Sequence, residues 1–197
     1  MMTTVTGLFD NYDDARRAVD ALEEAGVASS DISIISNNET VDNGNLAAEG
    51  AGTGAGIGAV AGGAGGLLAG LGLVAIPGVG PVVAAGWLAA TLAGAAAGAA
   101  VGGAAGGIIG ALTDSGVPEQ EAEFYAESLR RGGTVVIARV NESHVDIATS
   151  ILQRSNVVDP VARRRLYEDE GWTRFDEAAP PYSAEERQRL RDRYRQV

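Results

Sequence analysis

Few residues of this chain have types and spacing suited to chemistry. Glu142, His144 and Asp146 alternate along a short stretch, and carboxylate and imidazole groups at close spacing are side chains that bind metal ions. They lie where a predicted strand is followed by a predicted helix, and acidic groups near a helix start interact favourably with the helix dipole. We therefore predict that they cap the helix, and the sequence predicts no metal-binding residues.

Other motifs also fall short of a site. The paired acids Asp13–Asp14 and Glu23–Glu24 fit exposed helix faces. Residues 56–61 fit the GxGxxA pattern of dinucleotide-binding turns, but no strand leads into them and no acid follows about 20 residues later. Chance in a Gly/Ala-rich segment explains the match. We predict no catalytic residues, no cofactor and no small-molecule substrate, and we expect the protein not to be an enzyme.

The composition of the 197-residue chain removes several kinds of chemistry. There is no Cys, which excludes disulfides, iron–sulfur clusters and thiol nucleophiles. All 15 basic residues are Arg, so neither a Schiff-base lysine nor the lysine of a Walker loop is present. The formal net charge of −11 opposes binding to nucleic acid, whose affinity comes mainly from basic side chains on phosphates. The sequence therefore predicts no nucleic-acid partner.

The charged residues divide the chain into zones. Residues 50–113 carry no charged side chain and hold 21 of the 28 glycines, whereas both flanks are acidic. No basic segment followed by a long apolar run opens the chain, so we predict no secretory signal. We expect a discontinuous α+β domain at 1–49 and 114–160, an inserted apolar segment at 50–113, and a charged tail with a C-terminal helix at 161–197.

The two flanks predict the element order of a ferredoxin-like domain. Strand-like runs occupy 5–9, 32–35, 134–140 and 156–158. Helices with one apolar face are predicted after the first and third strands, which gives β-α-β-β-α-β. An extra helix is predicted at 118–131, between the second and third strands. The expected inward positions are Ala15, Ala18, Val19 and Leu22, then Ala122, Tyr125, Ala126 and Leu129, then Ile147, Ala148, Ile151 and Leu152.

Two blocks of the flanks resemble the bacterial general stress protein domain, also called the heat-induced stress protein domain. They are VTGLFDNYDDARRAVDALEEAGVASSDISIIS and VPEQEAEFYAESLRRGGTVVIARV. The resemblance covers about residues 4–160 and involves packing and turn positions. Members of this family often carry a Gly/Ala-rich apolar insertion between the two halves, and the family offers no catalytic residues. The resemblance therefore implies a stress-associated, non-enzymatic bacterial protein.

The uncharged zone contains two ladders of small residues at four-residue spacing, separated by the turn-like residues 77–81. Because positions i and i+4 lie on one helix face, each ladder predicts a smooth surface on which another helix packs closely. A helical hairpin follows, with each helix long enough to cross the ~30 Å hydrocarbon core of a bilayer. The predicted helix-packing residues are Gly50, Gly54, Gly58, Gly62, Gly66, Gly70, Gly86, Gly94, Gly98, Gly102, Gly106 and Gly110.

The tail at 161–197 carries large apolar side chains in a polar context. Trp172, Phe175 and Tyr182 are candidate partner-docking residues, and the alternative is that they pack on the α+β domain itself. Ser183 opens a predicted capping box before an Arg-rich helix. That helix either contacts anionic lipid headgroups or is a plain solvated helix.

The environment of the predicted hairpin decides the functional prediction. Glycine costs a helix in water about 1 kcal/mol per site relative to Ala, whereas hydrocarbon offers the backbone no other hydrogen-bond partner. We therefore expect a non-enzymatic, stress-associated protein of the cytoplasmic membrane that self-associates through a glycine-zipper hairpin, with its domain and tail on the cytoplasmic side. Its expected partners are the lipid bilayer and further copies of the chain. The alternative is a soluble oligomeric assembly or scaffold protein with the hairpins buried in the oligomer core.

Overall fold

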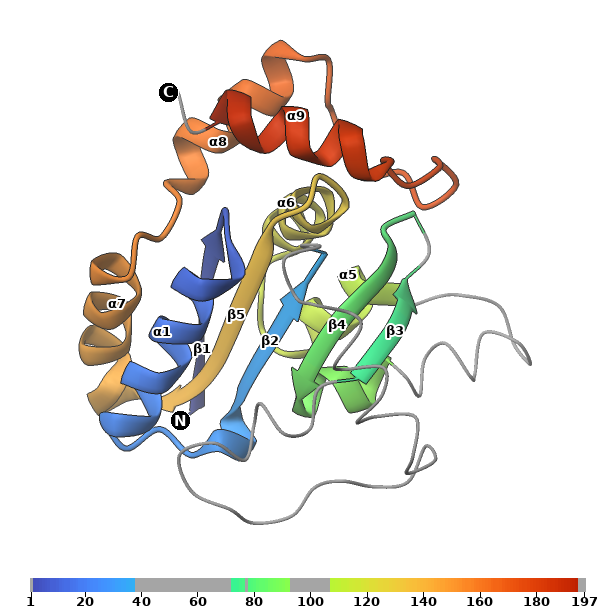
Figure 1. The fold of residues 1–197 in the computed structure, drawn as a ribbon. Coiled ribbons are helices and arrows are strands. Elements are labelled where there is room, and N and C mark those ends of the chain that lie inside the picture. The colour runs from blue at the N-terminus through green and yellow to red at the C-terminus, as the bar shows by residue number, and fades with distance from the viewer. Residues whose placement is uncertain (1, 38–71, 77, 93–106, 195–197) are drawn as a thin grey trace.

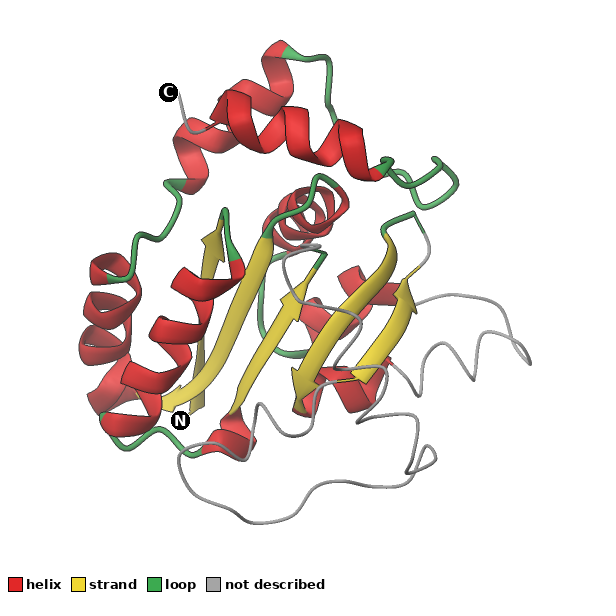
Figure 2. Cartoon of the chain, in the orientation of Figure 1, coloured by secondary structure: helices red, strands yellow, loops and turns green. Residues whose placement is uncertain are grey.

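The sheet at the centre of the molecule joins segments from both acidic flanks and from the uncharged zone. The computed structural model describes residues 2–37, 72–76, 78–92 and 107–194. These form a five-stranded antiparallel sheet with helices on both faces, so the predicted α+β class is confirmed (Figure 2). The strand order is β1-β5-β2-β4-β3. The strands are β1 (Met2–Phe9), β2 (Ile32–Ser36), β3 (Gly72–Ile76), β4 (Gly80–Gly86) and β5 (Thr134–Asn141).

The helices cover the two faces of the sheet separately (Figure 1). They are α1 (Tyr12–Glu24), α5 (Gly107–Asp114), α6 (Glu119–Arg130), α7 (Val145–Arg154), α8 (Pro160–Asp169) and α9 (Ala184–Tyr194), and residues 87–92 are also helical. One apolar cluster joins α1 and α7 to one face. A second cluster joins α5, α6 and the C-terminal helices to the other face.

Helix α1 forms as its sequence predicts. The Asn11 side chain accepts a hydrogen bond from the Asp14 backbone N–H at 2.9 Å, which satisfies one of the free amides of the first turn. The predicted inward residues Ala15, Ala18, Val19 and Leu22 are all fully buried. The helix stops before Gly26, whose φ of 91° is readily adopted by glycine.

Helix α6 also buries its predicted positions, and it is followed by a tight turn. A Cβ at Gly133 would lie 2.9 Å from the Ser128 carbonyl oxygen, so only glycine allows β5 to start this close to the helix. In α7, Ala148, Ile151 and Leu152 are buried as expected. Ile147 is 48% exposed, so its predicted inward orientation is wrong; it lies in the first turn of α7, beyond the edge of the buried face.

The predicted fourth strand of the ferredoxin-like order is not formed. β1 and β2 both pair antiparallel with β5, as that order requires of the first three strands. Residues 156–158 make a single backbone contact with β1, in which Val158 N–H donates to the Leu8 carbonyl at 2.7 Å. Asn156 has φ of 62°, outside the extended region, which breaks the strand at its start. The sheet grows at its other edge instead, through β4 and β3.

The predicted helical hairpin is wrong around its turn, although residues 87–92 and α5 are helical as it predicts. β3 and β4 form an antiparallel strand pair, with Val74 opposite Val82. Their β-branched side chains favour strands, and Gly78 and Gly80 have φ of 73° and 94°, which suits a turn between strands. These short-range features are incompatible with two helices meeting at this turn, although the glycine spacing alone predicts them.

The membrane interpretation depended on that hairpin and is also wrong. Within the described ranges, no helix has the length and apolar composition needed to cross a bilayer. β4 pairs with β2, so this part of the uncharged zone is built into the same sheet as the flanks. The expected location at the cytoplasmic membrane, with the lipid bilayer as partner, depended on the same hairpin and is wrong for the same reason.

Candidate functional site

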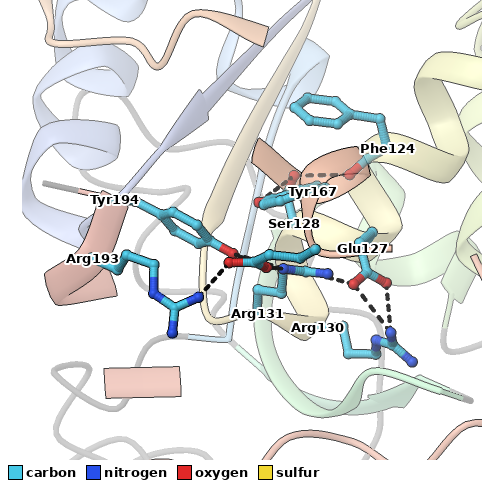
Figure 3. A network of polar contacts seen from close by, with 9 residues as sticks. Phe124, Glu127, Ser128, Arg130, Arg131, Tyr167, Arg193 and Tyr194 are labelled. Atoms are coloured by element: carbon cyan, nitrogen blue, oxygen red, sulfur yellow. Dashed lines mark hydrogen bonds and ion pairs between the residues drawn. The ribbon is translucent and has the colours of Figure 1, made fainter. Parts of the chain in front are cut away.

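A fully buried carboxylate lies at the C-terminal end of α6. Glu127 is 0% exposed and accepts a hydrogen bond from Arg131 Nε at 2.6 Å (Figure 3). Arg130 Nη2 donates to its Oε1 at 3.1 Å and lies 2.9 Å from its Oε2. A buried charge without a partner is costly, and the i+3 and i+4 positions of the same helix supply two guanidiniums here.

Arg131 connects this carboxylate to both C-terminal helices. Its Nη1 donates to the Tyr194 hydroxyl of α9 at 2.7 Å and also to Glu170, at the end of α8. The Tyr194 hydroxyl in turn donates to Glu170 at 3.2 Å. Arg193 Nη1 lies 2.6 Å from the other oxygen of Glu170. A single guanidinium therefore fixes three helices relative to one another, as Figure 3 shows.

Aromatic rings pack beside the polar network. Tyr167 of α8 is buried, with ring centroids of Phe124, Tyr194 and Trp172 at 5.7, 5.6 and 6.1 Å. The Arg131 guanidinium lies 4.2 Å from the Tyr167 ring centroid, a cation–π distance. The Tyr167 hydroxyl donates to Ser128 Oγ at 3.2 Å. The C-terminal helices are thus held by ring packing as well as by charge.

A second ionic contact fixes the start of α8. Arg163, 7% exposed, donates from Nη1 and Nη2 to the two carboxylate oxygens of Asp10 at 2.7 and 2.9 Å. This bidentate geometry is the strong form of an Arg–carboxylate pair. Asp159 caps α8, since its side chain accepts from the Val161 backbone N–H at 2.8 Å.

Burial and neighbouring charges shift the pKa values of four groups in the network, Arg131, Tyr167, Glu170 and Tyr194. Burial alone would lower the pKa of Arg131, but the hydrogen bond and charge of Glu127 outweigh burial and raise it. Burial alone would raise the pKa of Glu170, but its hydrogen bonds, chiefly from Arg131, leave it lowered. Burial raises the pKa of the Tyr194 and Tyr167 phenols. Each of these shifts moves a pKa away from neutral pH, whereas a general acid or base needs a pKa near the working pH.

The predicted docking residues of the tail lie on the molecule itself. Trp172 and Phe175 are 7% and 6% exposed and belong to the apolar cluster beside α6. Tyr182 is half-buried, with the Arg130 guanidinium 5.1 Å from its ring centroid. Ser183 and Glu186 form the predicted capping box before α9. The tail therefore folds back over the second face of the sheet.

The residues predicted to cap the helix lie at the start of α7, but neither the 3₁₀ turn before it nor α7 itself has a side-chain hydrogen bond at its N-cap. Glu142 and His144 form a short 3₁₀ turn and Asp146 is in the first turn of α7. Glu142 and Asp146 are exposed, and the His144 ring contacts Ser143 at 3.2 Å. In the described part of the chain, no three His, Cys, Asp or Glu side chains lie together as a metal site would need.

Two members of the glycine ladders fall in the described residues. Gly86 ends β4 with φ of 89°, and a Cβ there would lie 2.8 Å from Ser33 Cα and against the Ile32 carbonyl. It is in a strand end, where close approach of β2 requires glycine. Gly110 lies in α5, with open space around the position of a Cβ. The helix-packing role of the other ladder glycines remains a prediction, because they lie outside the described residues.

The buried network was not predicted from the sequence. Glu127 and Ser128 sit between Ala126 and Leu129, beside the apolar face of α6, and an acid next to a buried face with Arg131 four residues later is the available signal. Nothing in the sequence pairs these residues with Tyr167 or with α9, because those contacts join distant segments.

Comparison with protein families identifies one segment. Residues 4–74 match the model of the heat induced stress protein YflT domain, which confirms the predicted resemblance to the general stress protein family. The match begins in β1, includes α1 and β2, and ends in β3. No curated protein and no solved structure matches the chain.

Proposed function

We propose that this protein, in which residues 4–74 match the heat induced stress protein domain, is a non-catalytic, stress-associated assembly protein that associates with further copies of itself. The acidic flanks and the C-terminal helices supply a rigid, charged body. The uncharged zone supplies the contact between copies.

The observation that carries this proposal is the position of the uncharged zone in the sheet. β3 and β4 contain no charged residue, and they lie at the edge of the sheet opposite β1. Two copies with a formal charge of −11 each repel one another over most of their surface. The uncharged edge is the part of the described body at which a second copy meets the least repulsion.

The polar network supports a non-catalytic role. Its shifted groups bond to one another and hold α8 and α9 in place, as Arg131 does with Tyr194. None of these shifts moves a group toward titration at neutral pH. A network of this kind stabilises a particular arrangement of helices.

We further infer that β1, α1, β2, β5 and α7 represent a ferredoxin-like unit that lacks its last strand. The β1-β5-β2 order and the positions of α1 and α7 on one face support this interpretation. In its place a single Val158–Leu8 hydrogen bond covers part of the β1 edge, and the β3–β4 pair extends the other edge.

Sedimentation velocity of the full chain over a wide concentration range tests the proposal. We expect a dimer or larger species that persists in about 0.5 M NaCl, because contact through uncharged backbone is not weakened by screening. Association that disappears in salt would indicate ionic contacts between the charged surfaces instead. A monomer at every concentration would refute self-association.

The non-catalytic part is tested by substitution. Any turnover measured with the purified protein should be the same in the His144→Ala and Arg131→Met variants as in the parent. A turnover that Arg131→Met abolished while the unfolding temperature stayed near that of the parent would establish a catalytic role for the network.

A further inference from the structure

We propose that the outer edge of β3 is the contact between copies, where it pairs antiparallel with β3 of a second copy. The twofold axis passes beside Val74, and the two five-stranded sheets form one continuous sheet. This inference rests on the proposed self-association and names its partner and its surface.

The register of the sheet defines which backbone groups point out of this edge. Ala75 lies opposite Pro81, which has no N–H to donate. This pair therefore fits a position where neither residue bonds the other, and in antiparallel pairs such positions alternate with bonded ones. It follows that Val74 and Ile76 bond to β4, whereas Leu73 and Ala75 direct their N–H and C=O groups away from it.

The opposite edge gives the same assignment independently. The Leu8 carbonyl accepts from Val158 N–H, so Leu8 directs its backbone groups out of the β1 edge. The registers then carry the alternation across the sheet: Leu8 faces Val135, Val135 faces Ile35, Ile35 faces Ala84, and Ala84 faces Gly72. Gly72 therefore bonds toward β4, and Leu73 and Ala75 point outward once more.

The two edges of the sheet differ in how far other segments cover them. The β1 edge is partly closed by Val158, and β1 is followed by the acidic residues of α1. Along the β3 edge, no other described strand pairs with Leu73 or Ala75. Natural sheets protect open edges with charged residues, proline or a covering segment. The segment 72–76 has neither a charged residue nor a proline, so it offers an edge on which a strand can add.

A second copy fits this edge because the edge is complementary to itself. With the axis beside Val74, Leu73 of one copy faces Ala75 of the other, and the reverse pair forms at the same time. These two bonded pairs give four backbone hydrogen bonds between the copies. The isologous arrangement also brings together two uncharged strands, whereas the rest of each −11 chain favours separation.

Proline substitution tests the assignment of outward groups. Ala75→Pro removes an N–H that the intramolecular sheet does not use, so we expect the fold to remain and the dissociation constant of the dimer to rise about ten- to hundredfold. Val74→Pro is the matched control: it removes an N–H used by β4, and we expect it to lower the unfolding temperature. Equal dimer affinity for Ala75→Pro and the parent would overturn the inference.

Disulfide trapping provides a readout that does not depend on tolerance of proline. The chain has no Cys, so Val74→Cys introduces a single thiol. Across the axis, Val74 faces its own copy at a non-bonded pair, where Cα atoms lie about 4.5 Å apart and a disulfide fits. We expect mild oxidation to give a covalent dimer at least about tenfold faster than for Ile147→Cys, a thiol on the exposed surface of α7.

Leu73→Cys separates this register from general proximity. Its copy lies two residues along the partner strand, more than about 7 Å away between Cα atoms, so a disulfide should not form readily. If Val74→Cys crosslinks no faster than Leu73→Cys or Ile147→Cys, the β3 pairing is refuted. The same result is expected if another segment of the same chain covers this edge, so that case also counts against the pairing. If the parent nevertheless associates, only this inference fails; a monomeric parent refutes the proposed function as well.

Discussion

On one face of the sheet, α1 and α7 bury mainly aliphatic side chains such as Val19, Leu22 and Ile151. On the other face, α6 buries the charged Glu127 and Arg131, and the aromatic Tyr167 and Tyr194 complete the contact. The first face also joins distant segments, since α1 packs beside α7, but its contacts are mainly apolar. The second adds a network of charged groups, in which Arg131 contacts Tyr194, 63 residues later in the chain. The two faces should therefore respond differently to substitution, salt and pH.

The largest effect is expected at the charged face. Glu127→Leu removes the buried carboxylate that Arg130 and Arg131 contact. Losing one partner of a buried ion pair costs about 3–5 kcal/mol of unfolding free energy. Chemical denaturation measures this loss.

The matched control is Glu127→Leu combined with Arg131→Met. Replacing both partners with apolar groups of similar volume is often close to neutral, but Arg131→Met also removes the contacts with Glu170 and Tyr194, so only part of the stability should return. A single substitution that costs less than about 1 kcal/mol would contradict the importance of the buried charge.

At the aliphatic face the expected loss is somewhat smaller. Leu22→Ala empties a fully buried position of α1 and should cost about 3 kcal/mol. Because no charge is involved, the loss should be the same at about 0.05 and 0.5 M NaCl. Ile147→Ala on exposed α7 is the control and should change stability by less than about 0.5 kcal/mol. A strongly salt-dependent loss for Leu22→Ala would remove the contrast between the two faces.

These two faces were also predictable to different degrees. The positions Ala15, Ala18, Val19 and Leu22 repeat at helical spacing, so the sequence alone gives the buried face of α1. The contacts of Arg131 with Tyr194 have no local pattern, because they depend on how the tail folds back. The positions of α8 and α9 over α6 are therefore decided only when the whole chain folds.

The β3–β4 pair shows how a regular pattern misleads. Glycine every fourth residue predicts helices, and the pattern includes Gly86. In the structure Gly86 has φ of 89° and ends a strand beside Ser33, where a Cβ would clash. Glycine allows close backbone approach both between packed helices and between paired strands, so glycine spacing could not distinguish helices from strands here. The β-branched residues Val74, Ile76, Val82 and Val83, on either side of a Gly-rich turn, carried the correct signal.

The helix cap of α1 gives a smaller test of the aliphatic face. Asn11→Ala removes the acceptor for the Asp14 N–H and should cost about 1 kcal/mol. Asn11→Ser keeps an acceptor oxygen and should recover most of that loss. Thermal unfolding followed by circular dichroism measures both, and equal effects of Ala and Ser would argue against capping.

The smallest effect concerns the pH dependence of the charged face. Folding lowers the pKa of Glu170, so its carboxylate stabilises the folded state above the unfolded value near 4.3. That contribution disappears as the pH falls through the lower folded-state value. Glu170→Gln should therefore be less stable than the parent at pH 7, by less than about 1 kcal/mol for a partly exposed pair.

The difference between Glu170→Gln and the parent should vanish in acid. A series of unfolding temperatures from pH 7 to about pH 3 measures it. Leu22→Ala serves as the comparison, because its loss should persist across the series. A constant difference for Glu170→Gln at all pH values would contradict the ionic contribution.

The distance along the chain between α6 and its cover affects synthesis of the protein. Arg131 leaves the ribosome 63 residues before Tyr194, its partner in α9. At translation rates of about 5–20 residues per second, Arg131 waits roughly 3–13 s for Tyr194, and Phe124 beside it also waits for the helices that bury it. Helices form far faster, within microseconds. During each round of translation, the nascent chain therefore presents an aromatic surface to chaperones and to other nascent chains before α8 and α9 exist to cover it.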